Sequence, residues 1–204
     1  MLIHEKGPFV RGSILLISFL VLFCVLLTPI MRDEKGNHLT GLQYADNVFN
    51  ELSKGSSYFI PSVREHVKTV EKVNVKVTVT MKKAELAETA VQVLTKAGMT
   101  ASADGAKVSY EGNLAAMLNA ATTDADNLYH NDDATVSARY DGTHALKAAA
   151  AWWYVLSPSI KELQKQRLIA EAQVVDQVLR RAVEPGNNFY SVEPVKVSDH
   201  IWLM

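Results

Sequence analysis

Cysteine is almost missing from this chain: Cys24 is the only one among 204 residues. A single thiol cannot form an internal disulfide, and it cannot supply a thiolate zinc site or an iron–sulfur cluster. The sequence has no C-x-x-C-H motif, which excludes a covalently attached c-type haem. Cys24 lies inside a long apolar run, where a thiol behaves as a small hydrophobic group. We therefore expect no cysteine nucleophile outside that run.

An excess of charge of one sign is also missing, because 21 Lys and Arg face 22 Asp and Glu. Without a basic stripe to neutralise phosphates, we expect no nucleic-acid partner. The chain has no G-x-S-x-G, G-x-x-x-x-G-K or G-x-G-x-x-G motif, and no two histidines share a helix face at i, i+3 or i+4. Catalysis would have to use dispersed side chains, so we predict no enzymatic activity and no cofactor.

The longest apolar run is what the chain does have: residues 13–31 are 19 residues without a charge. As a helix they would span about 28 Å, close to the hydrocarbon core of a bilayer. The run predicts an uncleaved transmembrane helix. A cleaved signal peptide is the first alternative, but no A-x-A-like cleavage site follows, and a buried core helix is the second.

Basic residues flank both ends of this run. Lys6 and Arg11 precede it with the α-amino group, and Arg32 and Lys35 follow it, so the positive-inside rule slightly favours a cytoplasmic N-terminus. We expect a single-pass protein with most of its chain outside the cytoplasm, facing the periplasm from a bacterial inner membrane.

The predicted fold class is α+β, with a transmembrane helix, a small βαβα-type domain and a C-terminal helical pair. The predicted parts are, in order, an N-terminal tail, the transmembrane helix, a polar linker, an extracytoplasmic α+β domain, the helical pair and an irregular tail with an apolar end. Their bounds are 1–12, 13–31, 32–41, 42–142, 143–184 and 185–204.

Alternating valines in residues 72–80 predict a strand with one buried face. An amphipathic helix over 82–97 and a second strand over 106–111 follow. We expect these two strands to pair in parallel through a right-handed crossover. Two strands bury too little surface, so a third is needed, and residues 135–140 or 190–197 are the candidates.

The final third is predicted to be helical and begins with the alanine-rich segment 143–156. Pro158 either kinks one long helix or starts a second. Ser159 and Glu162 have the spacing of a capping box, which favours a second helix that runs to about Val183. Its two heptads are too few to predict a coiled coil, so it packs on its own domain or faces a partner.

A polar cluster occupies residues 122–133. Asp126 and His130 are four residues apart and would share a helix face, and three further aspartates nearby would add oxygen ligands for a hard cation. The calcium-loop pattern fails because Tyr129 stands where glycine is required. The cluster is either a solvated helix end or a weak metal site at Asp126 and His130. An enzyme that uses such a metal is the one catalytic interpretation left open.

Aromatic residues offer the best candidates for contact with a partner. Three adjacent aromatics point about 100° apart on a helix, so at least one should meet a partner, a ligand or lipid. Asn187 and Asn188 open a second candidate loop, and the apolar C-terminus would dock on the domain, rest at the membrane interface or begin a second span. The candidate contacts are Trp152, Trp153, Tyr154, Phe189, Tyr190 and Trp202.

These patterns together predict a non-catalytic, membrane-anchored accessory or scaffolding subunit. Its partners would be the lipid bilayer and other membrane or extracytoplasmic proteins, including further copies of itself. The alternative is a membrane-anchored module that binds or senses a small ligand in a pocket beside the α+β unit.

Overall fold

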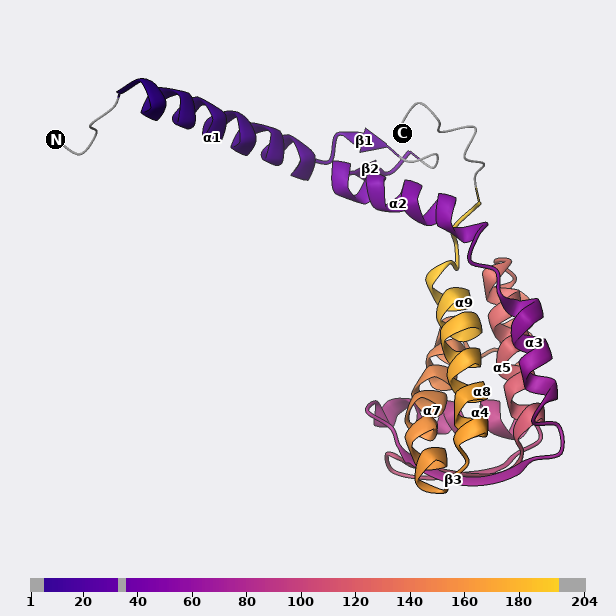
Figure 1. Ribbon diagram of the computed structural model, residues 1–204. Coiled ribbons are helices and arrows are strands. Elements are labelled where there is room, and N and C mark those ends of the chain that lie inside the picture. The colour runs from indigo at the N-terminus through magenta and orange to yellow at the C-terminus, as the bar shows by residue number, and fades with distance from the viewer. Residues whose placement is uncertain (1–5, 33–35, 195–204) are drawn as a thin grey trace. The chain divides into compact units, whose positions relative to one another are not determined.

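The computed structural model describes residues 6–32 and 36–194 of a mixed α+β chain (Figure 1). The described residues form two compact units, one up to Ser53 with Pro194, and one from Lys54 to Glu193.

The first unit begins with helix α1 (Lys6–Leu27), which is long and apolar enough to cross a membrane by its length and composition. It starts before the predicted segment 13–31, ends at Leu27 and not at Met31, and has no buried residue. The helix ends just before Pro29, because a proline ring disfavours the helical conformation at the residue that precedes it, here Thr28. Thr28 Oγ1 donates to the carbonyl of Cys24 over 2.8 Å and so pairs one of the last free carbonyls.

A short ladder and a capped helix complete the described part of this unit. β1 (Met31–Arg32) pairs antiparallel with β2 (His38–Leu39). Met31 belongs to the predicted transmembrane segment, and the other three residues lie in the predicted linker. Helix α2 (Gly41–Lys54) starts with a reciprocal cap between Thr40 and Gln43, in which each side chain accepts from the other's backbone N–H at 3.2 and 2.9 Å.

The second unit contains a three-stranded sheet in which every pairing is antiparallel. Its strand order is β3-β5-β4, so β5 is central. From its start to the end of the helix after the sheet, the second unit contains, in chain order, α3 (Ile60–Lys68), β3 (Asn74–Thr80), the 3₁₀ turn η1 (Ala84–Leu86), α4 (Ala87–Lys96), β4 (Thr100–Asp104), β5 (Lys107–Asn113) and α5 (Leu114–Tyr129).

The predicted parallel pairing is wrong. The sequence Thr-Ala-Ser-Ala-Asp of β4 has no alternation of large apolar side chains, so its pattern does not predict a strand. It forms a tight hairpin with β5 around Gly105, whose φ of 56° is easy for glycine. The chain therefore runs strand–helix–strand–strand–helix, and β5 returns to pair antiparallel with β3.

Both candidates for a third strand are wrong where the structure describes them. Residues 135–140 lie largely in helix α6 (Asp133–Arg139), which starts because the side chain of Asp132 accepts from the backbone N–H of Thr135. Residues 190–194 contain no strand, and 195–197 lie outside the described residues.

Helices cover one face of the sheet and stand beside one another above it (Figure 1). Val75, Val77 and Val79 point into the core, whereas Lys76 and Thr78 between them are exposed. After α6 the chain forms α7 (Ala145–Lys165), α8 (Ile169–Val178), the π-helix η2 (Leu179–Val183) and α9 (Glu184–Asn188).

The predicted helix start at Ser159 is wrong, because α7 continues through Pro158 to Lys165. Ser159 is buried, and its Oγ donates to the carbonyl of Val155 and accepts from the hydroxyl of Tyr110 at 2.6 and 2.7 Å. Ser159 therefore connects α7 to the sheet through Tyr110, and it is not the N-cap of a second helix. The chain turns later, at Arg167, whose φ is 65°.

Candidate functional site

A buried carboxylate joins three helices in the centre of the second unit. Asp124 of α5 accepts hydrogen bonds from Arg139 of α6, from the hydroxyl of Tyr140 and from Trp152 Nε1 of α7. Burial raises the pKa of Asp124, while these three donors and the charge of Arg139 act in the opposite direction. Asp124 is 1% exposed, so its oxygens serve internal packing and are closed to a ligand.

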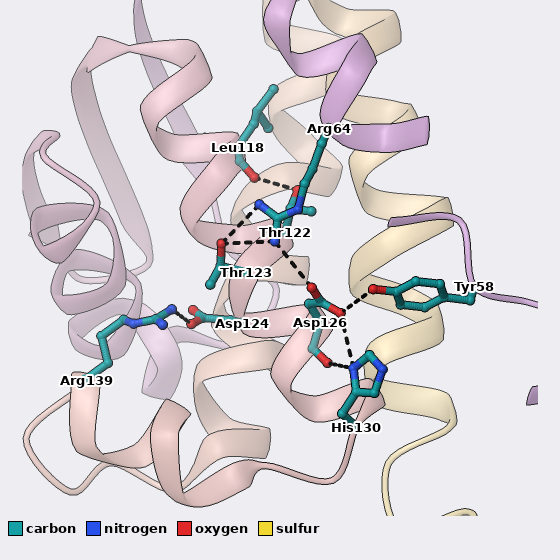
Figure 2. A network of polar contacts seen from close by, with 9 residues as sticks. All are labelled: Tyr58, Arg64, Leu118, Thr122, Thr123, Asp124, Asp126, His130 and Arg139. Atoms are coloured by element: carbon teal, nitrogen blue, oxygen red, sulfur yellow. Dashed lines mark hydrogen bonds and ion pairs between the residues drawn. The ribbon is translucent and has the colours of Figure 1, made fainter. Parts of the chain in front are cut away.

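The predicted pair Asp126 and His130 does meet on one face of α5 (Figure 2). His130 Nδ1 lies 3.2 Å from Asp126 Oδ1. Two residues that the sequence patterns did not indicate complete the cluster: Arg64 of α3 lies 3.3 Å from Oδ2, and the hydroxyl of Tyr58 donates to Oδ1 over 2.9 Å.

The cluster contains two side chains of metal-ligating type, Asp126 and His130, beside an arginine and a tyrosine. Across the residues that the structure describes, no group of three or more His, Cys, Asp or Glu side chains is placed to hold a metal ion. The guanidinium of Arg64 already compensates the charge of Asp126, so a cation would have to displace it. Burial and the bond to Asp126 raise the pKa of Tyr58 to about 12. The cluster ties α3 to α5.

A groove of about 310 Å³ lies where α7 meets the η2–α9 segment, and it contains two of the predicted aromatic residues. Trp152 turns into the core and is 1% exposed, while its neighbours Trp153 and Tyr154 are half-buried and line the groove. The angular spacing of adjacent helix residues separates them in this way. Ala149 and Ala150, one turn earlier, are small and leave the space open.

Polar side chains form the opposite wall of this groove. Glu184, Asn187 and Asn188 line it, and Trp153 Nε1 donates to Glu184 Oε1 over 3.1 Å. The rings of Trp153 and Tyr154 meet edge to face with centroids 5.0 Å apart. We call this site the aromatic–carboxylate groove.

A glycine sets the position of the polar wall. A Cβ on Gly186 would lie 2.5 Å from the carbonyl oxygen of Ala125, so α9 reaches α5 only because residue 186 has no side chain. This backbone contact places Asn187 and Asn188 at the rim.

The other predicted contact residues lie outside the groove. Phe189 packs edge to face on Tyr129, with centroids 5.8 Å apart, and Tyr190 is half-buried against the core. Trp202 lies outside the described residues. Cys24 is exposed on α1.

The sequence patterns did not predict Glu184 in the groove lining or Lys83 over the Tyr154 ring, and they did not predict Arg64 and Tyr58 beside Asp126. Glu184 is 31 residues from the tryptophan that it accepts from, and Lys83 Nζ lies over the Tyr154 ring at 5.7 Å from far earlier in the chain. Residues so far apart in the sequence have no fixed spacing that would predict their contact, so the sequence alone does not identify these pairs.

A second groove, of about 770 Å³, lies among α3, α7 and α8. Its wall mixes apolar and polar side chains and includes His66, Gln164, Gln173 and an ion pair between Arg180 and Asp176 at 2.8 Å. No aromatic ring of Trp, Tyr or Phe is among its lining residues, in contrast to the aromatic–carboxylate groove.

Comparison of the chain with known protein families, with curated proteins and with solved structures finds no match.

Proposed function

We propose that this protein is a non-catalytic, single-pass membrane protein that binds or scaffolds other proteins of a membrane assembly through its folded second unit. The observation that carries the proposal is that α1 is apolar along its length, and that none of its 22 residues is buried within the part of the chain that the structure describes.

Among the described residues, the buried members of the hydrophobic core lie between Ile60 and Val183. Helix α1 contributes nothing to that core and has no buried residue in its 22 residues. A helix that is apolar on all sides needs an apolar surrounding, and its length suits a bilayer. We therefore assign α1 to the membrane, with the N-terminus in the cytoplasm and the second unit in the periplasm.

The charged clusters of the second unit support a structural and binding role. Asp124 and Asp126 each pair with an arginine from another helix, so their charges hold the helices together. The aromatic–carboxylate groove combines half-buried aromatic rings with a hydrogen-bonded carboxylate, and tryptophan and tyrosine are enriched among the residues that dominate binding at protein interfaces.

Purification of the full chain from its native membrane in mild detergent, followed by mass spectrometry, tests this function. We expect a protein partner to co-purify at a fixed stoichiometry. The partner should stay bound when the complex is washed with high salt or diluted. A monodisperse monomer that retains no other protein would contradict the proposal.

A small-ligand-binding module is the second candidate, and the groove itself favours it. Its volume of about 310 Å³ is at the lower limit of typical ligand pockets, and it joins aromatic walls to convergent polar groups. Native mass spectrometry of the purified chain would show a small-molecule adduct, and the variant Tyr154→Ala should lose it while Tyr44→Ala keeps it.

A further inference from the structure

We propose that the aromatic–carboxylate groove receives one cationic side chain, a lysine ammonium or an arginine guanidinium, from the partner protein. This inference rests on the proposed function and adds the chemistry of the contact. It follows from the charge, the aromatic faces and the size of the groove.

The charge of the groove is negative. Among the residues that line the groove, Glu184 is the one that carries a charge at neutral pH, and the rest are neutral aromatic, amide or aliphatic side chains. The hydrogen bond from Trp153 Nε1 to Oε1 fixes the carboxylate in place. Arg180, which interacts with the charge of Glu184, already pairs with Asp176 at 2.8 Å. An incoming cation would thus find a preorganised carboxylate.

The aromatic pair favours the same kind of ligand. Ring faces attract cations, and tryptophan and tyrosine do so most strongly. The chain already shows this at Tyr154, where the Lys83 ammonium lies 5.7 Å from the ring centroid. Lys83 is exposed and outside the groove lining, so it shares Tyr154 with any cation that enters.

The volume of the groove suits a single side chain better than a large ligand. A space of about 310 Å³ accommodates an extended lysine or arginine side chain, whereas dinucleotides and haem need more room. The alanine floor lets the aliphatic stem lie against apolar surface while its charged end reaches Glu184.

The test uses the full chain in detergent with ¹⁵N-labelled tryptophan, and it follows the Trp153 indole N–H resonance, which Trp153→Phe assigns. Three capped tripeptides serve as probes: Ala-Lys-Ala, Ala-Arg-Ala and Ala-norleucine-Ala, which has the lysine stem without the charge. We expect saturable shifts with the two cationic peptides and at least about tenfold weaker binding of the norleucine peptide.

Two pairs of variants localise the effect. Glu184→Gln can still accept from Trp153 but has no charge, and it should weaken binding of the lysine peptide about tenfold, while Glu171→Gln on α8 should leave it unchanged. Lys83→Met frees the Tyr154 face and should strengthen binding about threefold, while Lys161→Met, which changes the net charge equally, should not.

Other outcomes would overturn the inference. Equal binding of the lysine and norleucine peptides would make the groove an apolar site. Tighter binding of free butylamine than of either cationic peptide would assign it to a small ligand. If the wild type and Glu184→Gln both retain a stoichiometric partner and no peptide binds, the inference fails and the proposed function stands. If cationic peptides bind but no partner is retained, the proposed function fails and the charge preference of the groove stands.

Discussion

Helices α1 and α7 are almost equally long, at 22 and 21 residues, and they use their apolar residues in opposite ways. In α7 the apolar side chains form one face, and nine of its residues are buried in the second unit. In α1 they surround the helix and none is buried. A one-sided helix is stabilised by its own fold, whereas a helix that is apolar all round depends on the surrounding medium. Substitutions in α1 should therefore change membrane association, and substitutions in α7 should change the stability of the second unit.

The largest expected effect concerns the membrane. Leu20→Arg combined with Val21→Arg places two charges near the middle of α1, at a cost of about 5–7 kcal/mol for insertion. We expect the chain to be extracted from membranes by alkaline carbonate, while Leu20→Ala with Val21→Ala should stay bound. Continued membrane association of the double arginine variant would show that α1 is not the anchor.

The core of the second unit should respond to α7 and not to α1. Trp152→Ala removes a buried ring and a hydrogen bond to Asp124, so it should lower the free energy of unfolding by about 4 kcal/mol. Phe19→Ala in α1 should leave that value unchanged. Urea unfolding in detergent, followed by circular dichroism, measures both, and an equal loss in the two variants would mean that the units share a core.

A smaller effect is expected where backbone meets backbone. Gly186→Ala would force its Cβ against Ala125, so we expect a loss of about 2 kcal/mol and a shift of the Trp153 indole resonance as the rim moves. Gly55→Ala is the control, because a Cβ there meets nothing within 4 Å. Unchanged stability of Gly186→Ala would show that α9 can move away from α5 freely.

The smallest effect is electrostatic and appears only in alkali. Because the pKa of Tyr58 is raised to about 12 in the folded chain, its contribution to stability is complete below the ordinary tyrosine pKa of about 10 and is lost as pH rises through 12. Asp126→Asn should shift the Tyr58 pKa downward in an NMR-detected titration of labelled tyrosine. An unaltered pKa in Asp126→Asn would rule out the carboxylate as a cause.

Elements with a strong period were predictable, and those with small side chains were not. The valine alternation identified β3, and the amphipathic spacing after it identified α4, because each pattern reports burial of one face. The alanine and serine residues of β4 carry no such signal, and without that strand the pairing direction of β5 was assigned incorrectly.

The candidate sites divide in the same way. The meeting of Asp126 with His130 followed from their i, i+4 spacing. The angular spacing of adjacent residues predicted that the three aromatics could not all face one core, but it did not predict that Trp152 would be the buried one. Arg64 and Glu184 reach these residues only through helix packing, which depends on Gly186 and on the turn at Arg167. Tertiary contacts of that kind leave no trace in local sequence.

The π-helix η2 bears on how this chain tolerates changes in length. A π turn holds about one residue more than an α turn, so the segment 179–183 absorbs an insertion between α8 and α9. Deleting Arg181 would let the wider turn relax to α geometry, with the helices on either side kept in phase. The same deletion at Ala172 would rotate every later residue by about 100° and carry Glu184 away from Trp153.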